Sequence, residues 1–130
     1  MKNVLISFFA VVLLANTSGC ADPAFSSSTK NDMKQIGMYY VSHTVTHGAP
    51  PASKEEFVEK TPEAKEIVES GDYVIQWGYD IDGDDRTNRS SMVLAYHKDV
   101  PELGGFVTLA DASAKVVTKE EFASMSKAGE

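Results

Sequence analysis

The spacing of apolar residues changes at Tyr73, and this change limits the fold more than any other feature of the sequence. Before it, from about Thr29 to Thr46, apolar residues recur every three or four positions, which is typical of a helix face. After it, large apolar residues occupy every odd position from Tyr73 to Ile81, which is typical of a strand. The chain therefore predicts an α+β fold with helices first and a sheet second.

The remaining strands are expected after Tyr73–Ile81, at Ser91–His97, Gly105–Ala110 and Ala114–Thr118. Short connections rich in Asp, Gly and Pro separate them, so we expect a small antiparallel meander of about four strands. The long first helix should cover the face that carries Ile75, Trp77 and Tyr79.

Shorter helices are indicated by their caps. Ser53–Glu56 has the pattern of a capping box, in which the serine and glutamate side chains each bind a backbone N–H group. Thr61 precedes a second short helix, with Pro62 at its first position and Gly71 after its end. A second capping box at Thr118 predicts a short C-terminal helix.

The start of the chain, residues 1–19, is typical of a secretory signal peptide. Lys2 provides a basic start, Val4–Ala15 is mostly apolar, and small residues lie before the expected cleavage site. Because the apolar run is shorter than the roughly 18–20 residues that span a bilayer, we expect it to be removed rather than retained.

Cys20, the only cysteine, directly follows this leader. Ser18 and Gly19 before it resemble the lipobox of bacterial lipoproteins, although Thr17 stands where that pattern usually has Leu. The resemblance implies that Cys20 is acylated and becomes the first residue of the mature chain. Two or three acyl chains anchor a protein stably where one would not. The alternative is a free or intermolecularly bridged thiol.

The residues after Cys20 suggest a location. Asp directly after the lipidated cysteine tends to retain lipoproteins in the inner membrane, whereas here Ala21 follows and Asp22 comes one later. The outer membrane, facing the periplasm or the surface, is therefore favoured. We expect residues 20–28 to form a flexible tether with a reach of roughly 15–17 Å, and residues 29–130 to form one domain.

The charge of the chain excludes some partners. The formal net charge is −7, and removal of a leader whose one charged residue is Lys2 would leave −8. An acidic surface repels phosphate backbones, so we expect no nucleic-acid binding. It also disfavours binding to anionic headgroups, and membrane contact would depend on the lipid.

Three segments in order resemble pseudopilin-like proteins, relatives of the major pseudopilin of type II secretion. They are Asn31–Met38 followed by Gly48–Pro51, then Met92–Asp99, then Gly104–Asp111 with its continuation to Phe122. The resemblance implies a pseudopilin-like fold and a cell-envelope location, and it implies no catalytic residues. The hydrophobic helix that drives filament assembly in that family is absent.

Two residues depart from the family pattern. His97 stands where Glu is usual, and Ala112 stands where Gly is usual. Because Ala is strained at the positive φ that Gly tolerates, we expect the Asp111–Ser113 turn to use another turn type.

An aspartate-rich segment could hold calcium through Asp80, Asp82, Asp84 and Asp85. Alternating aspartates on a turn present the oxygen ligands that Ca²⁺ prefers. The EF-hand pattern fails because Gly83 comes early and Ser91 holds the twelfth position. The alternative is an exposed loop, in which Asp and Gly are favoured turn residues.

His43 and His47 are four residues apart and would share one face of a helix, a spacing that can bind Zn²⁺. A third ligand would have to come from His97 or a carboxylate. The pair could also form a pH-sensitive patch. The alternative is two surface or half-buried histidines near a helix end.

The pattern of motifs favours a protein without catalytic activity. The sequence has no Gly-x-Ser-x-Gly elbow and no phosphate-binding glycine loop after a strand. We therefore expect a lipid-anchored envelope module without a cofactor, which binds an unidentified envelope protein, for example through an exposed sheet edge. The alternative from another class is a module that binds Ca²⁺ or Zn²⁺.

Overall fold

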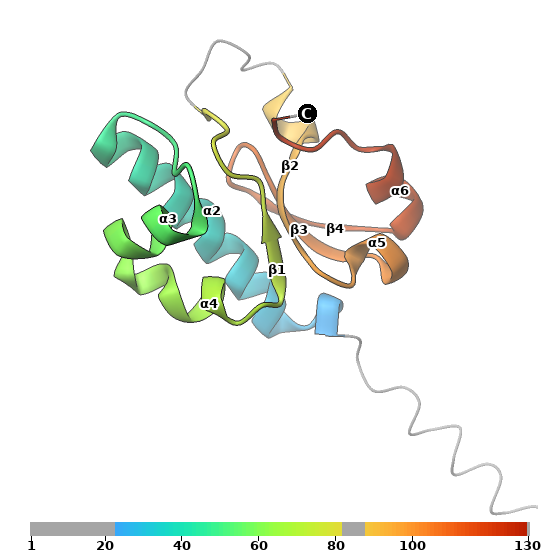
Figure 1. Cartoon of the computed structure of the whole chain (residues 1–130). Coiled ribbons are helices and arrows are strands. Elements are labelled where there is room, and N and C mark those ends of the chain that lie inside the picture. The colour runs from blue at the N-terminus through green and yellow to red at the C-terminus, as the bar shows by residue number, and fades with distance from the viewer. Residues whose placement is uncertain (1–22, 82–87, 130) are drawn as a thin grey trace, which may run out of the picture.

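The computed structural model describes residues 23–81 and 88–129, in which the helices come first and the sheet second (Figure 1). The helical part consists of η2 (Pro23–Phe25), α2 (Ser27–His47), α3 (Lys54–Lys60), η3 (Pro62–Ala64) and α4 (Lys65–Glu69). The sheet part consists of β1 (Tyr73–Ile75), η4 (Arg89–Ser91), β2 (Val93–His97), α5 (Val100–Leu103), β3 (Gly105–Leu109), β4 (Ala114–Val117) and α6 (Lys119–Ser124). The predicted α+β class is confirmed.

The sheet is an antiparallel meander in the order β1-β2-β3-β4, as predicted. Ile75 pairs with Ala95, and β2 has an irregular register against β3 near its start. The connection between β2 and β3 contains the short helix α5, which the sequence analysis treated as a loop.

The sheet separates two apolar clusters. On one face, α2, α3 and α4 pack with residues of β1 and β2, including Met33, Ile36, Tyr40, Phe57 and Leu94. On the other face, η2, α5 and α6 contribute Ala24, Val100 and Phe122 to a cluster with Val107 and Val117. Figure 1 shows α2 along one side of the sheet and α5 with α6 on the other.

Of the three predicted caps, one is complete, one is formed in part and one is absent. At the start of α3, Ser53 Oγ accepts a hydrogen bond from the Glu56 N–H, but the Glu56 side chain accepts from the Ala52 N–H and not from that of Ser53. Thr118 and Glu121 form the complete predicted capping box of α6. Thr61, in contrast, makes no side-chain cap bond, and the helix it precedes is divided into η3 and α4.

Helix α2 lies unusually close to β3 and the β3–β4 turn. The Thr108 hydroxyl donates a 2.6 Å hydrogen bond to the carbonyl oxygen of Met33, within the helix. A Cβ atom on Gly37 would lie 2.8 Å from the Ala112 carbonyl oxygen and 3.0 Å from Thr108 Cγ2. Gly37 is therefore the residue that permits this approach.

The β3–β4 turn contradicts the expectation for Ala112. This residue has a positive φ of 71°, the conformation that we expected an alanine to avoid. Asp111 Oδ1 accepts hydrogen bonds from the Ser113 N–H at 3.0 Å and from the Ser113 hydroxyl at 2.5 Å. The Ser113 carbonyl also accepts from the Leu109 N–H at 2.8 Å. These bonds hold the turn in a conformation that costs about 1–3 kcal/mol for a residue other than glycine.

The predicted strand Tyr73–Ile81 is wrong beyond Ile75. The buried phenol of Tyr40 binds the backbone there, since it accepts from the Tyr79 N–H at 3.0 Å and lies 3.0 Å from the carbonyl oxygens of Gln76 and Tyr79. Gly78, at φ 77°, donates to the Pro51 carbonyl instead of a neighbouring strand. The alternating residues still pack on the core, but from an irregular backbone.

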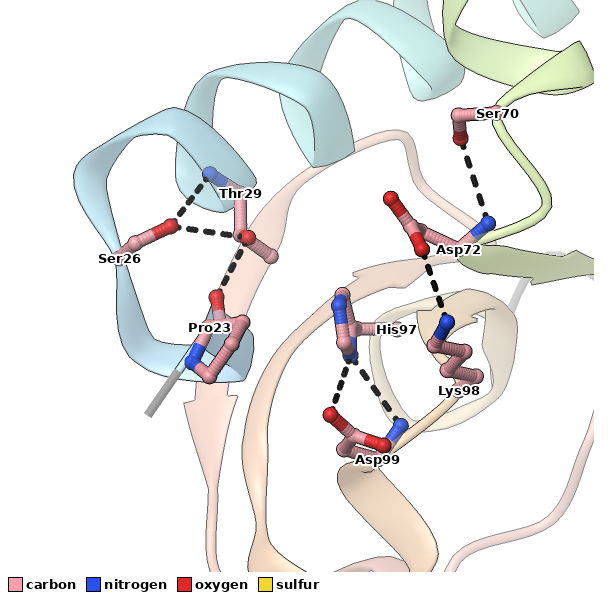
Figure 2. Close-up of polar contacts among 8 residues, drawn as sticks. All are labelled: Pro23, Ser26, Thr29, Ser70, Asp72, His97, Lys98 and Asp99. Carbon is pink, nitrogen blue, oxygen red and sulfur yellow. Dashed lines mark hydrogen bonds and ion pairs between the residues drawn. The ribbon is translucent and has the colours of Figure 1, made fainter. Parts of the chain in front are cut away.

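The predicted flexible tether is wrong for residues 23–28. Ala24 is fully buried against β3, and a Cβ atom on Gly105 would lie 2.6 Å from Ala24 Cβ. Ser26 caps α2 by accepting from the Thr29 N–H at 3.0 Å, and the Thr29 hydroxyl donates to the Pro23 carbonyl at 2.6 Å (Figure 2). We call these contacts the N-terminal clamp. Residues 23–28 thus belong to the folded part of the chain, which we expected to start at residue 29.

We expect Gly37→Ala to destabilise the protein by roughly 1–3 kcal/mol because the added methyl group would force α2 away from β3. Because the closest contact is with the backbone oxygen of Ala112, the cost lies in the upper part of this range and exceeds the gain of about 1 kcal/mol that alanine brings inside a helix. Urea denaturation measures the difference. Ser42→Ala, on the exposed face of the same helix, is the matched control and should leave stability unchanged or slightly raised. Equal stability of the Gly37→Ala variant and the parent would contradict the close packing.

Candidate functional site

The histidine pair lies at the C-terminal end of α2. The rings of His43 and His47 face each other with centroids 4.7 Å apart, so the prediction that they share a helix face is confirmed. The His43 side chain is fully buried, whereas His47 is exposed. The ring of Phe57 from α3 covers His43 at a centroid distance of 6.0 Å.

The buried imidazole of His43 lacks the hydrogen bonds that usually accompany a buried polar group. Its Nε2 atom lies 3.4 Å from Glu56 Oε1, and within the described residues neither ring nitrogen has a hydrogen-bond partner. Burial lowers the pKa of His43 below its ordinary value, and the adjacent His47 lowers it further, while Glu56 acts in the opposite direction. The folded state therefore favours the neutral imidazole.

The third ligand expected from His97 is not found at this pair. His97 lies at the end of β2, where its Nδ1 accepts a 3.1 Å hydrogen bond from the Asp99 N–H (Figure 2). Its ring also contacts the ring of Tyr73 at a centroid distance of 5.7 Å. Across residues 23–81 and 88–129, no group of three His, Cys, Asp or Glu side chains is arranged to hold a metal ion. The Glu56 carboxylate does lie near His43, but within the described residues it does not complete a three-ligand group with the two histidines.

Most of the aspartate-rich segment lies outside the described residues. Asp82, Asp84 and Asp85 belong to the range 82–87, and Asp80 is the one candidate calcium ligand that the structure describes. Asp80 follows the backbone segment that Tyr40 holds in place. The calcium hypothesis therefore stays a prediction.

An acidic cleft that the sequence analysis missed lies between α2, α4 and β1. It has a volume of about 360 Å³ and is lined by Ser28, Asp32, Gln35, Glu66, Ile67, Ser70, Asp72 and Tyr73. Inside it the Tyr73 hydroxyl donates a hydrogen bond to Asp32, and burial together with this carboxylate raises the pKa of Tyr73. Asp72 forms an exposed 3.0 Å ion pair with Lys98 (Figure 2). Two carboxylates of the cleft, Asp32 and Asp72, thus bind residues at the start of β1 and just after β2.

A second missed feature is an apolar groove beside the N-terminal clamp, which we call the leader-end groove. Its volume is about 360 Å³, and its lining comes from η2, α5, β4 and the start of α6: Phe25, Glu102, Leu103, Val116, Val117, Thr118, Lys119 and Glu120. Three large apolar side chains are exposed there, namely Phe25, Leu103 and Val116. The sequence does not predict this groove, because Phe25, Leu103 and Val116 come from three different segments of the chain.

The lipidation candidate Cys20 lies outside the described residues. Among the helices that are described, none combines the length and the apolar composition needed to cross a bilayer.

Comparisons with protein-family models, with curated proteins and with solved structures found no match to this chain.

We expect the stability of the protein to fall as the pH drops below about 6.5, the ordinary pKa of histidine. The unfolded chain takes up a proton on His43 there, whereas the folded chain, with its lowered pKa, does not. Stability is therefore lost between that pH and the lower folded-state pKa.

Denaturation at several pH values measures this loss. His43→Leu should reduce the pH dependence, and it breaks no hydrogen bond of the imidazole within the described residues. The exposed His47 provides the matched variant His47→Gln, which should keep more of the pH dependence than His43→Leu. An unchanged profile in His43→Leu would contradict the assignment.

Proposed function

We propose that the chain is an exported, lipid-anchored protein of the cell envelope whose domain acts through contacts with other molecules and without turnover. The observation that carries the proposal is a leader that ends in Ser18-Gly19 and is directly followed by Cys20, the only cysteine of the chain. The acylated cysteine would hold the domain at the membrane, and Ala21 after it favours the outer membrane.

The arrangement of the polar side chains supports a non-catalytic role. Asp72 binds Lys98, Asp32 accepts from Tyr73, and His97 accepts from the backbone of its own loop. The two carboxylates thus link segments that are distant in sequence, and His97 stabilises the turn that follows β2. The resemblance to pseudopilin-like proteins agrees with a binding module in the envelope and stays part of the proposal.

The membrane anchor can be tested by Cys20→Ala in the full-length chain. We expect loss of labelling by a fatty-acid analogue and a shift of the protein from the membrane fraction to the soluble fraction, because no acyl acceptor remains at the end of the leader. Thr17→Leu, which restores the usual lipobox residue, is the matched control and should keep both signals.

The result that would contradict the anchor is unchanged membrane fractionation of Cys20→Ala. A full-length protein that still carries residues 1–19 by mass spectrometry would contradict cleavage of the signal peptide.

A divalent-metal module is the second candidate, because α2 places the rings of His43 and His47 side by side. A metal at about one hundred times its Kd would add roughly 2.7 kcal/mol to the free energy of unfolding. A rise of this size with Zn²⁺ or Ca²⁺ over chelator would favour this candidate, and identical unfolding curves would reject it.

A further inference from the structure

We propose that the leader-end groove is the membrane-facing surface of the domain and that its exposed apolar side chains insert into the bilayer interface next to the lipid on Cys20. This inference rests on the proposed lipid anchor. It names the surface that the anchor presents to the membrane, and it commits to a lipid bilayer as the occupant of the groove.

The length of chain between the anchor and the fold carries the argument. Only Ala21 and Asp22 lie between Cys20 and Pro23, the first described residue. Three residue steps span at most about 10–11 Å even when fully extended. The expected tether of nine residues would have allowed the domain to turn freely, whereas this connection keeps Pro23 within that distance of the acylated residue.

The N-terminal clamp fixes where on the domain the chain arrives. Ala24 is buried against Gly105 at the start of β3, and Pro23 accepts a hydrogen bond from Thr29 in the first turn of α2. Two independent contacts, one to the sheet and one to the helix, thus hold the residues that follow the anchor. Figure 1 shows η2 at the end of the sheet where α5 lies.

The apolar side chains of the groove surround this point. Phe25 follows the buried Ala24 directly and is 42% exposed, Leu103 is 53% exposed, and Val116 is 46% exposed. They come from η2, α5 and β4 and line one groove. Aromatic and aliphatic side chains of this kind favour the region between headgroups and acyl chains. Their burial there would remove their exposed surface from water.

The charges at the groove suit a zwitterionic membrane surface better than a strongly anionic one. Lys119 lines the groove together with Glu102 and Glu120, so both signs of charge are present beside the apolar side chains. The lipid on Cys20 would supply the attachment, and the groove would supply the orientation.

Other exposed apolar residues serve as an internal comparison. Met38 and Val45 on α2 are 55% and 68% exposed, so exposure alone does not distinguish the groove. Val45 lies 18 residues along the helix from its start at Ser27, which corresponds to about 27 Å at 1.5 Å per residue. Among the exposed large apolar residues of the part of the chain that the structure describes, Phe25 of the groove is nearest in sequence to Cys20.

The test uses the full-length protein, expressed with its leader, purified in lipidated form and reconstituted into zwitterionic vesicles of phosphatidylethanolamine and phosphatidylcholine. Single cysteines replace Leu103, Val116 or Val45, and each is labelled with a fluorophore. Acylation of Cys20 leaves the new cysteine as the one free thiol. Nitroxide-labelled phosphatidylcholine in the vesicles then quenches those labels that contact the bilayer. Two groove positions from different elements guard against a variant that fails to fold.

We expect the labels at positions 103 and 116 to be quenched several-fold more than the label at position 45. Equal quenching at all three positions, in protein that floats with the vesicles, would overturn the inference and leave the lipid anchor intact. Protein that does not float with vesicles would overturn the anchor, and the inference with it. A photocrosslinker at position 103 that captures a protein in cells, and no lipid, would assign the groove to a protein partner instead and would overturn the inference.

Discussion

The close contact between α2 and β3 determines the rest of the arrangement. Gly37 lets the helix approach the β3–β4 turn, and the Thr108 hydroxyl binds the Met33 carbonyl within the helix. Met33 and Gly37 lie within one continuous helix, Ser27–His47. Fixing this part of the helix against β3 therefore also fixes where its two ends lie. One end carries the N-terminal clamp and the other carries the histidine pair, about 30 Å apart along the helix axis.

The two ends have different physical character, which bears on the proposed function. At the first end, the chain that leads from the lipidation candidate is fixed by Ala24 and Ser26 next to a groove of exposed apolar residues. At the other end, the His43 imidazole is buried under Phe57 and beside the exposed His47, and burial lowers its pKa.

Local features of the sequence predicted much of the fold. The caps at Ser53 and Thr118 and the two periodicities gave the correct order of helices and strands, because they depend on neighbouring residues. Contacts between distant residues were not predictable in this way. Tyr40 binds the backbone of residues 76–79 and ends β1 early, and Ala24 packs on Gly105 and removes most of the expected tether. The helix spacing predicted the adjacent histidines, but not the burial of one of them. The groove depends on three segments that only the fold brings together.

The contacts of residues 23–28 with α2 and β3 place this segment in the folded domain, within three residues of the expected anchor at Cys20. Amide hydrogen exchange of residues 23–30 in the full-length lipidated protein tests this placement most directly. We expect slow exchange at Ser26, Thr29 and Lys30, whose N–H groups donate to Pro23 O, Ser26 Oγ and Ser26 O, respectively. Exchange at the rate of an unstructured peptide across this segment would show a free tether and would contradict these contacts.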